Sequence, residues 1–280
     1  MTLLSSVRFW EHLRSGVVLL SDGAVGSELI RRGLAPEDVL AANSGLPSLV
    51  QDIHDGYIGS GADIITSNTF GLRNGKAWAS EFRAGAAIAV QSARTSIREI
   101  GVWLSMPAAV ASRESETIEF LQQSAAAWPG MILVETCISL REAQTALESA
   151  ALLRPDVIAV TAHFRSDGNM PDGTTPEEFA RTMERGGAHI VGANCGDTPE
   201  HFIEITSRMK YAVRIPLLIQ PSAGLPERDA SGQWRYPVDA DRFSVVAAHL
   251  VEAGANIIGG CCGTFREHIR ALRQSLPFQV

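Results

Sequence analysis

The sequence predicts an α/β protein that folds as a (β/α)8 TIM barrel, in a single domain spanning residues 1–280. Two observations lead to this fold class. Eight short runs rich in Val, Ile and Leu alternate with longer segments whose apolar residues follow helical spacing, and no linker or low-complexity segment divides them. Eight strand–helix alternations in a chain of 280 residues favour a barrel. An open, doubly wound parallel sheet is the alternative.

The predicted strands show little alternation of polar and apolar residues, as expected of parallel strands covered on both faces. They are 17–20, 63–67, 102–105, 132–135, 157–161, 189–192, 217–220 and 256–259. Helical patterns lie between them, for example at 140–153, where leucines and alanines share one face. Another helix is expected to begin at Pro176, after the capping residue Thr175 and before two glutamates.

A weak internal repeat marks three junctions between a helix and the next strand. The Gly-Ala pairs at 61–62, 187–188 and 254–255 each precede a predicted strand. Glycine permits the left-handed backbone that ends many helices, and the small alanine lets the chain turn into the sheet. The repeat therefore supports a chain built from successive strand–helix units.

Composition and charge exclude several classes of protein. The formal net charge of −7 argues against binding to nucleic acid, which requires a basic surface. No apolar run reaches the ~18–20 residues of a membrane span, and the N-terminus lacks the apolar core of a signal peptide. Four cysteines are too few for a disulfide framework in a chain of this length. We expect a cytoplasmic protein with reduced thiols that binds neither nucleic acid nor membranes.

Three of the four cysteines stand at the ends of predicted strands: Cys195 ends the sixth, and Cys261 with Cys262 ends the eighth. The carboxyl ends of barrel strands meet at one face, where active sites form. Three thiolates without a fourth protein ligand are typical of a catalytic zinc site, which keeps one position open for water or substrate. Sulfur ligands also suit copper(I) and iron–sulfur clusters. Ordinary packing of buried thiols is the alternative.

The pair Gly259-Gly260 precedes the two adjacent cysteines. Neighbouring side chains of a regular strand point to opposite faces, so two adjacent ligands require an irregular backbone, which glycine allows. A glycine-rich turn here can also bind phosphate, but no Lys or Arg follows before Arg266, which disfavours that role. Polar residues stand at or just after the ends of most of the other predicted strands, namely Asp22, Thr66, Asn68, Glu135, Thr161 and Gln220.

These strand-end motifs resemble those of the homocysteine S-methyltransferase family, which includes betaine–homocysteine methyltransferase and the homocysteine domain of cobalamin-dependent methionine synthase. The resemblance extends from about residue 20 to the C-terminus. It rests on Asp22-Gly23-Ala24, the segment 61–70, Glu135-Thr136, Asn194-Cys195 and the string Gly-Gly-Cys-Cys-Gly-Thr at 259–264. It implies transfer of a methyl group to the thiol of homocysteine, with methionine as the product.

The resemblance implies a catalytic centre in which Cys195, Cys261 and Cys262 hold Zn²⁺. A free thiol has a pKa of about 8.5, and binding to a metal ion deprotonates it. Three thiolates leave the site anionic, so the sulfur of a bound homocysteine should stay nucleophilic. Such a sulfur can attack a methyl group that is held at near-attack distance.

The resemblance also implies that Asp22 and Glu135 hold the amino group of homocysteine and that Asn194 lines the same pocket. An acid that follows an apolar strand is costly to bury without a partner, and the substrate ammonium group would be one. For Asp22, a role as a helix cap is the alternative. Cys137 lies outside the family motifs and is expected to be a packed thiol.

The methyl donor is less well determined, because the chain departs from the family pattern around the expected mouth of the barrel. The departures are at 105–109, at Ser222 and at Phe265-Arg266. We expect a small-molecule sulfonium such as S-methylmethionine or S-adenosylmethionine, with betaine or a separate corrinoid protein as alternatives. His163 lines the cleft, is solvated or packs in the core. The aromatic residues Tyr211, Trp234 and Tyr236 shape the pocket or simply pack.

Two other classes of protein compete with this interpretation. One is an iron–sulfur enzyme with three cysteine ligands, which the missing clustered cysteine spacing disfavours. The other is a non-catalytic zinc- or thiol-binding module, whose pocket would contain the same residues.

Overall fold

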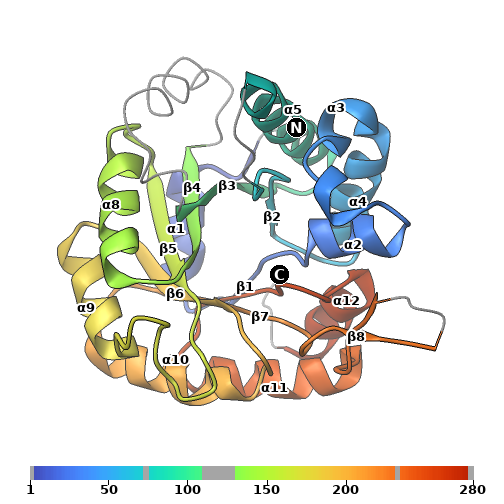
Figure 1. Cartoon of the computed structure of the whole chain (residues 1–280). Coiled ribbons are helices and arrows are strands. Elements are labelled where there is room, and N and C mark those ends of the chain that lie inside the picture. The colour runs from blue at the N-terminus through green and yellow to red at the C-terminus, as the bar shows by residue number, and fades with distance from the viewer. Residues whose placement is uncertain (1–2, 72–75, 109–129, 231–233, 277–280) are drawn as a thin grey trace.

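The computed structural model describes residues 3–71, 76–108, 130–230 and 234–276. In these ranges eight parallel strands form one sheet that curls into a barrel, with helices around it (Figure 1). The strands are β1 (Leu19–Leu20), β2 (Ile64–Thr66), β3 (Gly101–Pro107), β4 (Met131–Cys137), β5 (Val157–Ala162), β6 (Ile190–Cys195), β7 (Leu217–Pro221) and β10 (Ile257–Ile258). Each predicted strand overlaps one of them, so the predicted (β/α)8 barrel is confirmed.

The sheet closes between the short strands β1 and β2. The strand order is β1-β10-β7-β6-β5-β4-β3-β2, and a parallel bridge between Ser21 and Ile64 joins the two ends of this order. The carboxylate of Asp63 strengthens the junction, because it accepts a hydrogen bond of 2.9 Å from the backbone N–H of Leu20. Strand β1, near the start of the chain, therefore lies between β2 and β10, which is near the end of the chain.

The helices around the barrel follow the strands along the chain. They are α2 (Val25–Arg31), α3 (Ala42–Gly45), α4 (Pro47–Gly59), α5 (Lys76–Thr95), α8 (Leu140–Ala151), α9 (Pro176–Arg185), α10 (His201–Ala212), α11 (Ala240–Glu252) and α12 (Arg266–Ser275), with a short 3-10 helix at Pro36–Asp38. Helix α9 begins where the sequence predicts, and the Thr175 hydroxyl accepts a hydrogen bond from the backbone N–H of Glu178. Within the described residues, no helix is both long and apolar enough to span a membrane.

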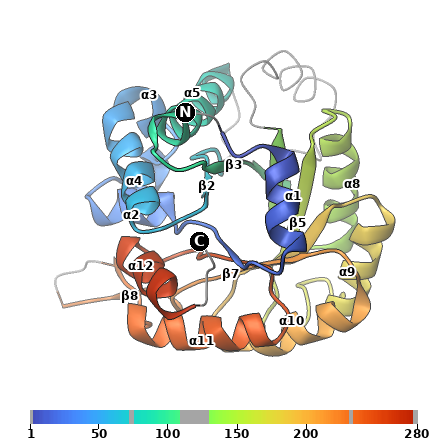
Figure 2. The same ribbon diagram turned by 180° about the vertical axis from the view of Figure 1, so that it is seen from behind.

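Helix α1 (Ser6–Arg14) lies across one end of the barrel (Figure 2). Its buried residues Phe9 and Leu13 belong to the same apolar cluster as inward-facing residues from the strands. The ring of Phe9 meets that of Trp103 on β3 edge to face, with 5.9 Å between centroids. Because α1 and this cluster close one end, the other end is left for ligands.

The Gly-Ala repeat stands where it was predicted, between a helix and the next strand. Gly61, Gly187 and Gly254 all have the left-handed backbone, with φ values of 110°, 91° and 113°. A side chain at Gly254 would also collide with Lys210, whose Cγ would lie 2.7 Å from an added Cβ. Glycine occurs at these three positions because each turn into the sheet requires a left-handed backbone.

Candidate metal and substrate site

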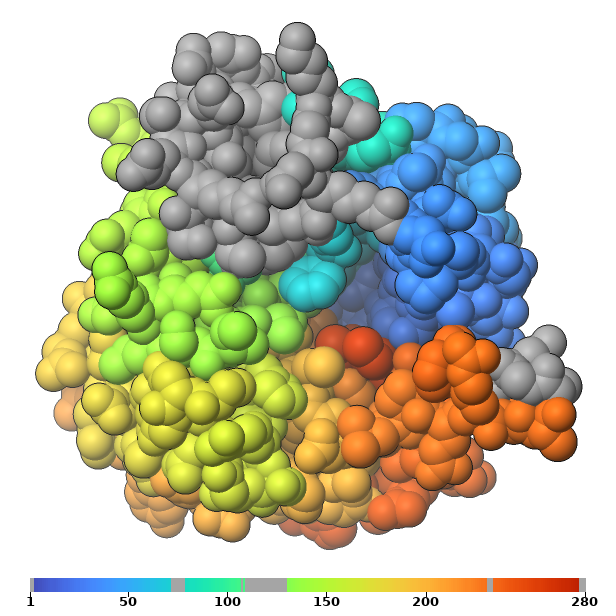
Figure 3. Space-filling view, viewed as in Figure 1, coloured from blue at the N-terminus to red at the C-terminus, as the bar shows by residue number. Residues whose placement is uncertain are grey.

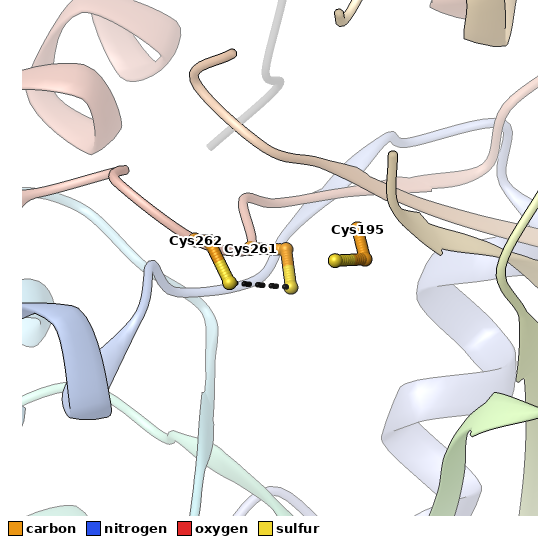
Figure 4. Close-up of side chains that lie close together, drawn as sticks. All are labelled: Cys195, Cys261 and Cys262. Atoms are coloured by element: carbon orange, nitrogen blue, oxygen red, sulfur yellow. Dashed lines mark hydrogen bonds between the residues drawn. The ribbon is translucent and has the colours of Figure 1, made fainter. Parts of the chain in front are cut away.

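The three cysteines that the sequence predicts as metal ligands converge at the carboxyl ends of β6 and β10 (Figure 4). Their sulfur atoms all lie within 4.8 Å of one another, and those of Cys261 and Cys262 are 4.0 Å apart. Zn–S bonds of about 2.3 Å in a tetrahedron place two sulfurs about 3.8 Å apart. The cluster therefore needs only a small contraction to hold a zinc ion. Within the described residues, no other group of three His, Cys, Asp or Glu side chains has this spacing.

The backbone around the cysteines is irregular, as adjacent ligands require. Cys195 has a left-handed backbone with φ of 70°, a conformation that is unusual for a residue other than glycine and often marks a functional site. A Cβ added to Gly260 would lie 2.2 Å from the Thr264 hydroxyl oxygen, and one added to Gly259 would lie 2.9 Å from the carbonyl oxygen of Asp22. Glycine is thus needed at both positions because other segments approach so closely.

The three thiols share their protons unequally. Hydrogen bonds from Cys261 and then Cys262 hold the pKa of Cys195 far below its ordinary value. The same interaction with Cys195 raises the pKa of Cys261 well above its ordinary value and that of Cys262 to about 11. Of the three thiols, Cys195 is therefore the one that ionises most readily. A cation placed between the sulfurs would stabilise all three thiolates.

His163 and Cys137 lie near this centre in different ways. His163 follows β5 and is half-buried, and its contact with Cys195 raises the pKa of the imidazole. It contacts the cysteine cluster but is not among the residues that line the cavity. Cys137 is fully buried at the end of β4, and burial raises the pKa of its thiol. Cys137 is the packed thiol that its position outside the motifs predicts.

Two carboxyl groups lie buried beside the cysteines. Asp22 is 1% exposed, and its carboxylate accepts hydrogen bonds of 2.8 Å from both the backbone N–H and the hydroxyl of Thr66. Glu135 accepts a hydrogen bond from the hydroxyl of Ser105. Burial raises the pKa of each carboxyl to about 7, and no cation among the described residues counteracts it.

Asp22 does not act as a helix cap. The residue that precedes α2 is Ala24, which provides no side-chain hydrogen bond to the helix. Asp22 and Glu135 are therefore two buried acids without a protein cation, an arrangement suited to an ammonium group from a ligand.

Asn194 links the strand ends on the other side of the cysteines. Its Oδ1 accepts hydrogen bonds from the backbone N–H of Thr136 at 3.0 Å and from the Thr161 hydroxyl at 2.8 Å. Its Nδ2 donates to the Thr136 hydroxyl and lies 3.9 Å from the sulfur of Cys261. Asn194 is not among the residues that line the cavity; Thr136, which it holds, is one of them. Its contacts are those of a residue that supports the wall.

A cavity of about 180 Å³ joins the two carboxyl groups to the three cysteines. It opens toward the end of the barrel opposite to α1, the face seen in Figure 3. The lining includes Asp22, Thr66, Phe70, Glu135, Gln220 and the cysteines, together with Ser27 and Val39. The sequence singled out most of these residues because they follow strands, but Ser27 and Val39 follow no strand directly and are part of no motif.

A family model described as homocysteine S-methyltransferase matches residues 19–276. The chain belongs to this family. The chain is similar to the homocysteine S-methyltransferase YbgG of Bacillus subtilis, which is 24% identical over 91% of this chain and 93% of that protein. The S-methylmethionine–homocysteine S-methyltransferase BHMT2 of Rattus norvegicus is 27% identical over 95% of this chain and 80% of that protein.

A third relative is much longer. The methionine synthase of Mycobacterium tuberculosis is 29% identical over 90% of this chain, but the match covers only 24% of that protein. The chain thus spans about a quarter of the length of this relative.

Among solved structures, the metallated form of the homocysteine methyltransferase MmuM from Escherichia coli matches with a TM-score of 0.76. It is 18% identical, over 96% of this chain and 99% of that one. At this level of identity the likeness shows a shared fold.

Proposed function

We propose that this chain transfers a methyl group from a sulfonium donor to the thiol of homocysteine, with Zn²⁺ as its cofactor and methionine as its product. One observation carries the proposal: three cysteines and two buried acids without a protein cation line the same cavity. The names of the family and of the relatives YbgG and BHMT2 point to the same reaction.

Cys195, Cys261 and Cys262 would hold the metal. Three sulfur ligands suit zinc and leave one coordination position for the substrate thiol. A bound zinc ion would keep that thiol deprotonated near neutral pH. A structure of the relative MmuM bears the description "metallated form", which supports a metal at this site. An iron–sulfur cluster is disfavoured because the clustered cysteine spacing is missing.

The buried acids would orient the amino acid. Asp22 and Glu135 lie in the cavity with the cysteines, so an ammonium group between them would leave the sulfur of homocysteine directed at the cysteine cluster. Hydrogen bonds from Thr66 to Asp22 and from Ser105 to Glu135 hold the carboxyl groups in place. Ammonium binding would favour the ionised carboxylates and lower their pKa values. Asn194 would support this pocket through Thr136.

The transfer itself exchanges one C–S bond for another. The homocysteine thiolate attacks the methyl carbon in line with the donor C–S bond, and the bonding pair returns to the donor sulfur, which leaves as a neutral thioether. No proton moves once the thiol is deprotonated. The residues of this chain contribute by holding both reactants at near-attack distance. In well-oriented reactions such positioning lowers the activation barrier by up to about 7–11 kcal/mol.

A second candidate role is transfer from a separate corrinoid protein, which the match to methionine synthase favours. Betaine as donor and a non-catalytic zinc- or thiol-binding role are the remaining alternatives. We further propose that residues 1–280 act as one barrel domain in the cytoplasm.

The test is methionine formation measured by mass spectrometry, with zinc-verified protein, homocysteine and S-methylmethionine that carries a labelled methyl group. We expect labelled methionine from the wild type, and neither zinc nor product with Cys261→Ser. Cys137→Ala is the matched control, because Cys137 is buried outside the cavity; it should keep the zinc.

Full activity of a zinc-free Cys261→Ser protein would refute the mechanism. Binding of zinc and homocysteine without transfer from either S-methylmethionine or S-adenosylmethionine would refute the sulfonium donor. The same assay with betaine and with a methylated corrinoid protein would then decide among the remaining roles.

A further inference from the structure

A second cavity, of about 450 Å³, lies beside the first. Its walls come from α2 and the loop 33–36 after it, from Phe265, and from residues in or next to the hairpin of β8 (Glu227–Arg228) and β9 (Trp234–Arg235), among them Trp234 and Tyr236. In Figure 3 the blue segment that contains α2 and the orange segment that contains this hairpin lie side by side on the face opposite to α1. Its volume lies within the range of ~300–1,000 Å³ that is typical of small-molecule sites, and the proposed transfer to homocysteine assigns it no role.

The two cavities adjoin at Ser27, which lines both. The Ser27 hydroxyl is 3.4 Å from that of Tyr236 and accepts a hydrogen bond from the backbone N–H of Gly263, next to the metal-site cysteines. The ring of Tyr236 packs directly on Gly263, where an added Cβ would lie 2.1 Å from a ring atom. A ligand that occupies both cavities would therefore pass along Ser27 and Tyr236.

The second cavity is aromatic. The rings of Tyr236 and Phe265 meet edge to face with 6.3 Å between centroids, and Trp234 lines the cavity while 43% exposed. An aromatic side chain that lines a cavity and remains this exposed offers a face on which a planar ligand can stack.

Two arginine side chains indicate what charge a planar ligand in the second cavity should have. The guanidinium of Arg31 lies 4.7 Å from the centre of the Phe265 ring, and that of Arg228 lies 4.3 Å from the centre of the Trp234 ring. Two hydrogen bonds to the buried carboxylate of Glu28 fix Arg31 in place. Each guanidinium covers one face of its ring, and Arg31 itself lines the cavity, so an ammonium or sulfonium group placed there would meet a like charge. A neutral or electron-rich ring is the better occupant.

The first cavity has the opposite character, because it contains two carboxyl groups and the cysteine sulfurs. A ligand that brings a cationic sulfur to the first cavity past Ser27 and keeps a planar, uncharged ring in the second matches both cavities. Among sulfonium donors, a nucleoside sulfonium has this form, whereas S-methylmethionine has no ring.

We propose that the second cavity binds the nucleobase of a nucleoside sulfonium donor, S-adenosylmethionine, with Trp234 as a stacking residue. This inference rests on the proposed transfer to homocysteine. In that transfer the methyl–sulfur bond of the donor breaks as the bond to homocysteine sulfur forms, and the electron pair returns to the donor sulfur. The products are methionine and S-adenosylhomocysteine, which keeps the nucleobase.

The test is isothermal titration calorimetry with S-adenosylhomocysteine, which requires no turnover. Base stacking on one aromatic side chain corresponds to about a tenfold effect or more on affinity. We expect Trp234→Ala to weaken binding at least tenfold and Trp234→Phe, which keeps a ring, to restore most of it. Tyr211→Ala is the matched control, since Tyr211 is a 91% exposed aromatic residue that lines neither cavity; it should bind as the wild type does.

Equal affinity of the wild type and Trp234→Ala, or no binding to the wild type, would overturn this inference. Kinetics supply a second readout: Trp234→Ala should lower kcat/KM for S-adenosylmethionine about tenfold relative to that for S-methylmethionine. An unchanged ratio would also overturn it. Methionine formed from S-methylmethionine tests the proposed function separately, because that donor has no nucleobase.

Discussion

Replacing Asp22 by asparagine should make the stability of the metal-free protein less dependent on pH. In the folded protein burial raises the pKa of Asp22 from 3.8 to about 7, whereas the unfolded chain keeps the ordinary value. The folded state therefore binds a proton more tightly than the unfolded state. Stability that this group contributes is fully present below pH 3.8 and is lost as the pH rises through about 7.

The shift gives the size of the effect. The two pKa values differ by about 3 units, which corresponds to about 4 kcal/mol at 1.36 kcal/mol per unit. About 1.5 kcal/mol of this is already lost at pH 5, because the unfolded carboxyl ionises first. The wild type should thus lose about 2.5 kcal/mol more than Asp22→Asn between about pH 5 and pH 8.

Asparagine is a suitable replacement because it can keep both contacts with Thr66. Its Oδ1 can accept from the Thr66 backbone N–H, and its Nδ2 can donate to the Thr66 hydroxyl, at the places where the carboxylate oxygens now accept. The variant then removes the ionisation and little of the packing. Glu135, whose pKa is also raised to about 7, titrates in both proteins. Its charge adds to the shift of Asp22, but burial of Asp22 is the larger cause, so most of the difference between the two proteins comes from Asp22.

The measurement is urea unfolding followed by circular dichroism at several pH values, with a chelator present for both proteins. Linear extrapolation gives the free energy of unfolding at each pH, and equal m-values show that the denatured states remain comparable. Parallel curves for the wild type and Asp22→Asn from about pH 5 to pH 8 would refute the argument that burial of this carboxyl opposes its ionisation.

Two further substitutions test the barrel itself. Gly192→Ala should prevent folding or lower the free energy of unfolding by more than about 3 kcal/mol. The added Cβ would lie 1.7 Å from the carbonyl oxygen of Leu218 on the neighbouring strand. Thermal denaturation measures the loss of stability. Asn194→Ala should cost at least about 2 kcal/mol, because the Thr136 N–H and the Thr161 hydroxyl lose their partner, and should raise KM for homocysteine in the labelled-methionine assay.

Gly59→Ala is the control for the first of these substitutions. Gly59 ends α4, and nothing lies within 4 Å of an added Cβ. This change should alter stability by no more than about 1 kcal/mol. A Gly192→Ala protein as stable as Gly59→Ala would contradict the close approach of β6 and β7, and an unchanged Asn194→Ala protein would contradict the role of Asn194 at the strand ends.

Much of the fold was predictable because it follows from local patterns. Continuous apolar runs predict parallel strands that are buried on both faces. The glycine of each Gly-Ala pair has the left-handed backbone that it was predicted to have. The strand ends were less predictable. β6 extends to Cys195, beyond the predicted 189–192, because pairing with β7 continues through Asn194 and Cys195. Of the departing segment 105–109, residue 109 lies outside the described residues.

The sequence by itself determined the (β/α)8 fold and the residues at the strand ends, including the three cysteines, because strand and helix periodicity and adjacent glycines act over short distances along the chain. Only the tertiary structure decided what surrounds them. Ser27 contacts Tyr236, which is 209 residues away in the sequence, and Asp22 contacts Thr66, which is 44 residues away. Closure of the barrel makes these contacts, removes water from the carboxyl groups and so raises their pKa values. It also places the aromatic cavity beside the metal site.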